Sequence, residues 1–97
     1  MREYEVTVIL IAGLEDEAQK EVLGRVEGWL GEGMAEDEEA KSEHWGQRTL
    51  AYPINKQTEG YYVYYEVVLD PVKIGEIERN FTYMDEILRH LVVRKED

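Results

Sequence analysis

The sequence from Trp45 to Val67 reads WGQRTLAYPINKQTEGYYVYYEV and contains two runs in which polar and apolar residues alternate. Alternation with a period of two is typical of β-strands, so it predicts strands over 47–54 and 61–69. The residues between them, 56–60, are expected to form the turn of a hairpin. Pro53 lies inside the first run. Because proline has no N–H to donate to a neighbour, this strand is expected at an edge of its sheet.

The flanking segments complete an alternating order of strands and helices. Residues 4–11 are typical of a central strand, and 87–95 of a last strand whose inward face the pattern does not decide. Residues 16–30 show helical spacing. A second helix is expected to begin at Asp70-Pro71, where a carboxylate can cap the first turn and proline fits the first helical position. The order β-α-β-β-α-β is the ferredoxin-like, split βαβ pattern of the α+β class, a four-stranded antiparallel sheet with two helices on one face.

Two local features carry further predictions. Gly24 and Gly28 lie inside the first helix, where glycine costs about 1 kcal/mol relative to alanine. This favours the interpretation that they allow a close approach to the sheet. The pattern does not decide the structure of residues 34–44, but the four successive acids at 36–39 are expected to form a solvated loop or strand tip. A calcium site is the alternative there, although the segment has no ligand loop of the EF-hand type.

Length and composition bound the class of protein. A chain of 97 residues is long enough for one core, so residues 1–97 are expected to form a single domain. The absence of cysteine excludes disulfides and thiolate metal sites. No apolar run is long enough to span a bilayer, and the residues after Met1 open directly into a strand-like pattern. The protein is therefore expected to be soluble and intracellular.

Charge is the main puzzle of the composition. Asp and Glu number 22 against 11 Lys and Arg, which gives a net charge of −11 at pH 7. Such an excess of acids argues against coating nucleic acid by bulk attraction. The acids are concentrated in residues 15–43, however, whereas bases outnumber acids in residues 86–95. This distribution still allows a local cationic strip on an acidic protein.

Catalytic chemistry is poorly represented. The single serine, Ser42, lies two residues from His44 without a visible orienting group, which is a chance-level arrangement for a nucleophile and its base. With His90 as the only other histidine, a histidine-rich metal site is excluded. No cofactor, metal or small-molecule substrate is expected. The tyrosines of residues 61–65 suit either a half-exposed strand or a sheet that stacks RNA bases.

Three segments resemble a known family: MREYEVTVIL at residues 1–10, GQRTLAYPINKQTEGYYVYYEV at 46–67 and MDEILRHLVVRK at 84–95. They are similar, in order and separation, to the family of the sixth protein of the bacterial small ribosomal subunit. The resemblance covers essentially the whole chain. Its most specific block is Arg48-x-Leu50-Ala51-Tyr52-Pro53-Ile54-x-Lys56-x-x-x-Gly60-Tyr61. It implies the same ferredoxin-like fold, no enzymatic activity, and a cytoplasmic location on the small ribosomal subunit.

The resemblance also implies partners. Members of the family bind the central domain of 16S ribosomal RNA together with the eighteenth protein of the subunit. A basic protein partner of this kind would supply cations that attract RNA and so allow an acidic chain to bind beside it. The residues expected to face RNA phosphates are Arg2, Arg48, Lys56, Arg89 and Arg94. The residues expected to form the protein-partner surface, on or beside the predicted edge strand, are Trp45, Leu50 and Tyr52, with a place in the core as the alternative for Leu50 or Tyr52. Glu3 departs from the family, where a second base is common.

Two other hypotheses stay open. A free-standing single-strand RNA-binding module of the RNA-recognition type would stack bases on one of two tyrosine faces, Tyr62 with Tyr64 or Tyr61 with Tyr65. A small enzyme on the same fold, such as an acyl-phosphate hydrolase, would need an anion-cradling loop with an arginine near the first turn. Residues 12–15 are Ala-Gly-Leu-Glu and contain no base.

Overall fold

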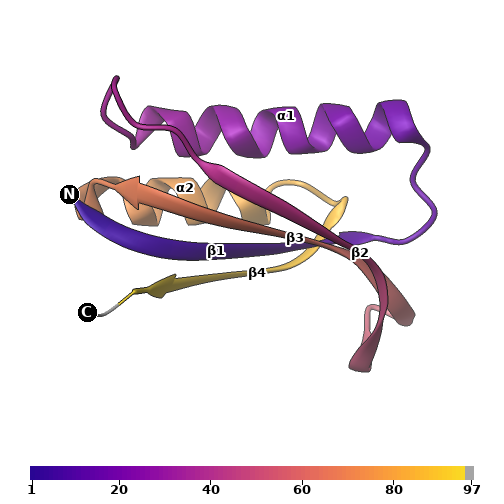
Figure 1. Ribbon diagram of the computed structural model, residues 1–97. Coiled ribbons are helices and arrows are strands. Elements are labelled where there is room, and N and C mark those ends of the chain that lie inside the picture. Colours follow the sequence, from indigo (N-terminus) through magenta and orange to yellow (C-terminus); the bar gives the residue numbers. More distant parts are fainter. Residues whose placement is uncertain (96–97) are drawn as a thin grey trace.

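The computed structural model describes residues 1–95. Its elements are β1 (Arg2–Ile11), α1 (Asp16–Glu32), β2 (Lys41–Ile54), β3 (Gln57–Leu69), a single 3-10 turn (Pro71–Lys73), α2 (Ile74–Thr82) and β4 (Ile87–Arg94). The strands form an antiparallel sheet in the order β2-β3-β1-β4, and α1 and α2 lie on the same face of it (Figure 1). The predicted ferredoxin-like fold is confirmed, and β2 occupies an edge as Pro53 requires.

The core lies between the helices and one face of the two central strands. Alternation places every second residue of these strands against α1 and α2, where apolar burial contributes about 1.5–3 kcal/mol for each large side chain. The buried residues of β1 and β3 are Tyr4, Val6, Val8, Leu10, Val63, Tyr65, Val67 and Leu69, and those of the helices are Val22, Leu23, Val26, Leu30, Ile77 and Phe81. This face is the one that the alternation of residues 4–11 and 61–69 defines.

One polar group reaches into this core. The hydroxyl of Tyr65 donates a hydrogen bond to Glu27 Oε2 of α1 at 3.0 Å, so the buried ring keeps its polar atom satisfied. Burial, and then the negative charge of Glu27, raise the pKa of the Tyr65 hydroxyl well above its usual range. The hydroxyl therefore stays protonated and continues to donate throughout the neutral pH range.

The start of α2 follows the predicted chemistry. The Asp70 carboxylate accepts a hydrogen bond from the backbone N–H of Val72 at 3.1 Å, and Pro71 opens the 3-10 turn that leads into the helix. This arrangement satisfies one of the N–H groups that have no partner in the first turn of a helix.

The turn between β2 and β3 is shorter than predicted. Asn55 and Lys56 have positive φ values of 48° and 66°, as in the two-residue type I′ turns that suit the twist of hairpins. β3 begins at Gln57, so the prediction of a turn over 56–60 is wrong. Asparagine tolerates positive φ values better than most residues, so Asn55 can occupy the first position of this turn in place of glycine.

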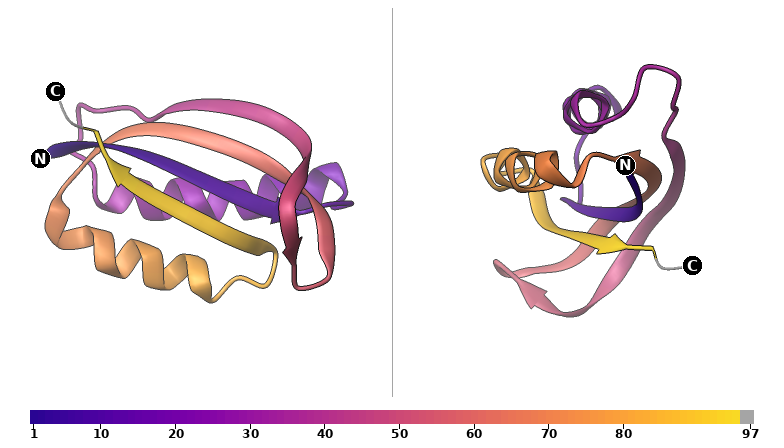
Figure 2. Two further views of the ribbon diagram at one scale, coloured as in Figure 1. Left: turned by 90° about the horizontal axis from the view of Figure 1, so that it is seen from below. Right: turned by 90° about the vertical axis from the view of Figure 1, so that its left-hand side faces the viewer.

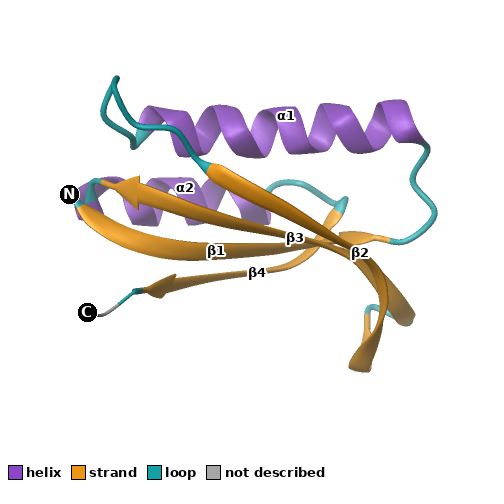
Figure 3. Cartoon of the chain, viewed as in Figure 1, coloured by secondary structure: helices purple, strands orange, loops and turns teal. Residues whose placement is uncertain are grey.

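The structure decides two further local features. The acidic residues 36–39 lie in a loop as expected, and Lys41–His44, which the pattern left undecided, belongs to β2 and pairs with β3 (Figure 3). The interpretation of Gly24 and Gly28 is wrong. Both residues are exposed, and a Cβ atom at either position would meet nothing within 4 Å. They lie on the outer side of α1, away from the sheet.

The far end of the β2–β3 hairpin curls away from the helices and passes under the opposite face of the sheet (Figure 1, Figure 2). Gly60 permits the bend. A Cβ atom at this position would lie 2.5 Å from Ile9 Cγ2 and 3.3 Å from the carbonyl oxygen of Leu10. Leu50 of β2 comes within 3.5 Å of the same point and is only 8% exposed. The hairpin is thus closed against β1 by a small apolar contact outside the main core.

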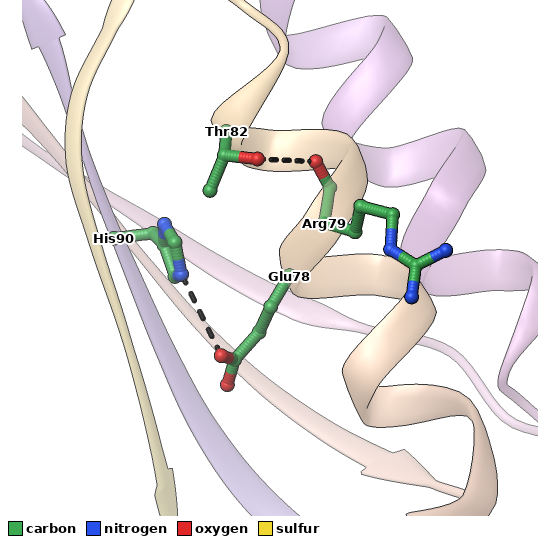
Figure 4. A network of polar contacts seen from close by, with 4 residues as sticks. All are labelled: Glu78, Arg79, Thr82 and His90. Carbon is green, nitrogen blue, oxygen red and sulfur yellow. Dashed lines mark hydrogen bonds and ion pairs between the residues drawn. The ribbon is translucent and has the colours of Figure 1, made fainter.

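The structure shows which face of β4 points inward. His90 faces α2, where its ring meets the edge of Phe81 with 5.4 Å between centroids. Its Nε2 atom lies 3.7 Å from the Glu78 carboxylate, beside the end of α2 where the Thr82 hydroxyl donates to the Arg79 carbonyl oxygen (Figure 4). Val92 also packs against the core. The alternate residues Arg89, Leu91 and Val93 are therefore the ones on the face without helices.

Replacing Gly60 by alanine is expected to destabilise the protein by about 1–3 kcal/mol, because the added methyl group forces Ile9 and the β1 backbone to move. Gly28→Ala, at an open position of α1, is the matched control and is expected to stabilise the protein by up to about 1 kcal/mol. Urea unfolding followed by circular dichroism measures both changes. A Gly60→Ala variant as stable as the parent protein would show that the close approach is not needed.

Candidate nucleic-acid and partner interface

The open face, meaning the face of the sheet opposite α1 and α2, is organised by the strand register. Side chains directly across from one another form rows that run from β4 through β1 and β3 to β2. The hairpin row is Arg89, Ile9, Tyr62 and Gly46; the middle row is Leu91, Thr7, Tyr64 and Glu43; the terminal row is Val93, Glu5, Glu66 and Lys41. The hairpin row is apolar with one arginine, whereas the terminal row contains two opposed carboxylates.

At the hairpin end, the curled hairpin brings Tyr52 of β2 to Arg89 of β4, although β3 and β1 lie between these strands in the sheet. The guanidinium of Arg89 lies over the Tyr52 ring, 5.9 Å from its centroid, and donates a hydrogen bond to the Tyr52 hydroxyl. Both side chains remain exposed. Cation–π contacts at exposed sites are worth about 0.5–1 kcal/mol, enough to favour one orientation of the guanidinium.

A second guanidinium rests on an aromatic ring farther along β2. The register of β2 shifts at Trp45, and Gly46 takes a φ of 83° that favours glycine. The indole stacks on Tyr64 with 5.3 Å between centroids and 11° between planes, and its Nε1 donates to Glu43 at 3.1 Å. The Arg48 guanidinium carbon lies 5.6 Å from the centroid of Trp45. Arg48, Trp45 and Tyr64 therefore form a layered group.

The five residues predicted to contact RNA do not gather in one patch. Arg48, Arg89 and the turn residue Lys56 lie at the hairpin end of the sheet. Arg2 and Arg94 lie at the other end, where Arg2 is opposite Leu69 and Arg94 is opposite Tyr4. Residues 2 to 9 of β1 span roughly 23 Å at about 3.3 Å per residue, so the two groups are well separated.

Within residues 1–95, no carboxylate neutralises these five cations. Over residues 1–95, the side-chain ion pairs within 4 Å join Arg25 to Glu21, His90 to Glu78 and Lys95 to Glu66. None of the five predicted RNA-contacting residues takes part in them, and all five are exposed. Their charges are available to an external anion.

The three residues predicted to form the protein-partner surface differ in exposure. Trp45 and Tyr52 are 41% and 55% exposed, whereas Leu50 is buried and belongs to the contact that closes the hairpin. Sequence reasoning missed Leu91 and Val93, which are 54% and 45% exposed on the open face. The alternation of residues 87–95 was visible, but nothing in that pattern indicates which face of the last strand is inward.

The terminal and middle rows share a cluster of acids around Tyr64. Its hydroxyl donates to Glu66 Oε1 at 3.3 Å, and Glu5 is directly opposite Glu66. Partial burial, and then the charges of these two carboxylates, raise the pKa of Tyr64 to about 12. Lys95 Nζ lies 3.6 Å from Glu66 and offsets part of the charge. Within residues 1–95, Glu5 has no cationic group inside 4 Å.

Within the described residues 1–95, no constellation suited to catalysis is present. The Nδ1 atom of His44 lies 3.0 Å from the Tyr61 hydroxyl, so its ring engages that tyrosine. No three His, Asp or Glu side chains in this range are placed to hold a metal ion. None of its helices has the length and apolar character needed to cross a membrane. A hollow of about 260 Å³ is lined mainly by charged side chains, including Glu3, Lys41, Glu66 and Lys95.

The fold and the open face together define a class, a ferredoxin-like binding domain that presents exposed arginines, aromatics and aliphatics on one side of its sheet. The family model described as ribosomal protein S6 matches residues 3–94. A small ribosomal subunit protein bS6 of Fusobacterium nucleatum subsp. nucleatum is 34% identical over 96 residues, covering 99% of this chain and 100% of that protein. A crystal structure of 30S ribosomal protein S6 from Thermotoga maritima matches with a TM-score of 0.86 and 27% identity, covering 97% of this chain and 87% of that chain.

The chain belongs to the ribosomal protein S6 family, as the resemblance implied. It is a structural, non-enzymatic protein of the small ribosomal subunit, which confirms the predicted ribosomal location and sets aside the enzyme hypothesis.

A double-mutant cycle with Tyr52→Ala and Arg89→Ala is expected to give a coupling free energy of about 0.5–1 kcal/mol, because the curl of the hairpin brings the two side chains into direct contact. Urea unfolding of the parent, single and double variants measures the coupling. The control cycle combines Tyr52→Ala with Arg94→Ala, at the opposite end of the sheet, and is expected to give no coupling. Equal coupling in the two cycles would contradict the contact.

Proposed function

We propose that the protein binds the central domain of 16S ribosomal RNA jointly with the eighteenth protein of the small subunit, and that residues 1–97 act as one domain. The observation that carries the proposal is the set of exposed cations, at both ends of the sheet, without carboxylate partners in residues 1–95. Cations without a carboxylate partner among residues 1–95 are suited to contacts with phosphate, even on a protein with net charge −11.

The arginines at the hairpin end are the best suited to RNA. A guanidinium binds phosphate through two parallel hydrogen bonds and can stack on an aromatic ring at the same time. Arg89 on Tyr52 and Arg48 on Trp45 have this arrangement already. Because each ring restricts its guanidinium before binding, less conformational entropy is lost on contact with RNA. Arg2 and Arg94 would contact phosphates at a separate point.

The net charge explains why a protein partner is needed. Each phosphate contact gains from one local cation, but the remaining acids repel the RNA over the Debye length of about 8 Å in physiological salt. A basic neighbour seated against the open face would reduce this repulsion and add cations of its own. Trp45 and Tyr52 are exposed aromatic side chains of the kind enriched at interface centres, so they are suited to contact this neighbour. Leu50 is buried and packs within the hairpin instead.

The alternative of a free-standing single-strand RNA-binding module is supported less well. Base stacking needs an accessible ring face. Tyr65 is buried beneath the helices, and Tyr64 carries Trp45 on its ring and the carboxylates of Glu5 and Glu66 nearby. Tyr62 is half-buried in the hairpin row. The tyrosines of β3 therefore offer little open surface for stacking.

The isolated protein is expected to bind a central-domain fragment of 16S ribosomal RNA feebly, and tightly only when the eighteenth protein is present. Filter binding from 50 to 200 mM salt measures both. In the ternary complex, Arg89→Gln is expected to reduce the slope of log affinity against log salt by about 0.7–0.9, because one fewer phosphate is neutralised. Lys20→Gln, the same change of charge on α1, is the control and is expected to leave the slope unchanged.

Tight binding of RNA by the isolated protein at physiological salt would contradict joint binding. An unchanged salt slope for Arg89→Gln would remove this residue from the RNA contacts.

A further inference from the structure

The exposed side of α1 carries a net negative charge. Between Asp16 and Glu32 the helix contains five acids and two bases, and all seven of these side chains are exposed. One of the bases, Arg25, lies 3.7 Å from Glu21, so part of its charge is already offset. The helical side of the molecule therefore presents mainly carboxylates to solvent.

Helix stability explains only some of these acids. Asp16 and Glu17 lie in the first turn, where the helix dipole favours negative charge. Glu32 lies in the last turn, where the same dipole disfavours a carboxylate, and no base accompanies it there. Across residues 1–95, the pair of Arg25 with Glu21 is the only ion pair of α1. A charge that does not stabilise its own helix is a candidate for a functional role.

The acids of α1 and the cations of the hairpin end face in opposite directions. α1 lies on one side of the sheet, and the curled end of the β2–β3 hairpin lies on the other (Figure 1, Figure 2). The hairpin carries Arg48 and Lys56, and Arg89 rests on it over Tyr52. The shortest principal extent of the molecule is 22 Å, more than twice the Debye length of about 8 Å in physiological salt. RNA at the hairpin end is therefore screened from α1, whereas RNA on the helical side meets its acids directly.

We propose that the exposed acids of α1 are specificity determinants, which repel RNA from the helical side and so restrict binding to the hairpin end. The inference rests on the proposed function, since it concerns how the proposed RNA contact is limited to one orientation. At the hairpin end the repulsion is screened and costs the complex little. On the helical side it weakens every contact with unrelated RNA, so the protein gains discrimination from a repulsive element.

The helical side has cations that such repulsion would need to mask. Lys20 and Arg25 of α1 and Arg79 of α2 are all exposed. Attraction of RNA without regard to sequence requires little more than cations near phosphates. Without the surrounding carboxylates, these three side chains would offer RNA a second way to bind. Glu21 is the most direct mask, because it lies beside Arg25.

The test is the double variant Glu21→Gln/Glu32→Gln. Both positions lie outside the first turn of α1, so the variant is expected to keep the thermal midpoint of the parent within a few degrees. By filter binding at about 100 mM salt, its affinity for an RNA duplex of unrelated sequence is expected to rise about three- to fivefold, because two negative charges near the phosphates are removed. Its affinity for the central-domain fragment, with the eighteenth protein present, is expected to stay within twofold of the parent.

Two control variants separate position from net charge. Glu43→Gln/Glu59→Gln removes the same charge from β2 and β3, and is expected to raise both RNA affinities together, so that their ratio is kept. Lys20→Gln/Arg25→Gln makes α1 more negative. It is expected to weaken binding of the unrelated duplex and to leave the complex with the central-domain fragment unchanged.

Three outcomes overturn the inference. The first is an unchanged affinity of Glu21→Gln/Glu32→Gln for the unrelated duplex. The second is an equal rise of both affinities, as in the Glu43→Gln/Glu59→Gln control. The third is a loss of affinity for the central-domain fragment, which would assign α1 to a contact within the complex. In each case, binding of the fragment by the parent with the eighteenth protein still upholds the proposed function. A parent protein that does not form this complex removes the proposed function itself.

Discussion

The contact between Gly60 and Ile9 is the constraint on which the open face depends. It lets the β2–β3 hairpin approach β1 more closely than any side chain at residue 60 would allow. Leu50 then seals the hairpin against β1, and Tyr52 is carried across the sheet to Arg89. β2 and β4 occupy opposite edges of the sheet, so without the curl of the hairpin their side chains would not meet. The pairing of Arg89 with Tyr52 thus depends on the absence of a methyl group at residue 60.

The sequence was sufficient for the fold because burial on one face imposes a period of two on β1 and β3 and a helical period on α1 and α2. It was insufficient wherever geometry depends on two segments at once. The Asn55–Lys56 turn lacks the glycine that marks most type I′ turns, so its position was missed. The sequence pattern left Leu50 undecided between the partner surface and the core, because the bend that buries it is not local. The Arg48–Trp45 pair depends on the bulge at Trp45–Gly46, and the Arg89–Tyr52 pair depends on the bend of the hairpin. Neither contact can be predicted from the spacing of residues in the sequence. The exposure of Leu91 and Val93 on the open face could not be predicted without knowing that His90 faces α2.

The distribution of charge gives the acidic composition a structural meaning. The exposed side of α1 holds several of the acids on the helical side of the molecule, away from the open face. On the open face itself, arginine is confined to the hairpin end and carboxylates to the terminal half. A protein with an overall charge that repels nucleic acid can therefore still present one cationic end to it, provided that its neighbours are arranged to match.

The irregular backbone of β2 has a consequence for the protein before it is assembled. A long strand at the edge of a sheet offers unpaired N–H and C=O groups to any other extended chain, and β2 has 14 residues. Its register is broken at Trp45–Gly46 and again between Thr49 and Ile54, and Pro53 lacks the N–H that a ladder requires. A second copy of the chain could not follow this edge for more than a few residues. The irregular edge therefore disfavours edge-to-edge aggregation of newly synthesised molecules before they are assembled into the ribosomal subunit.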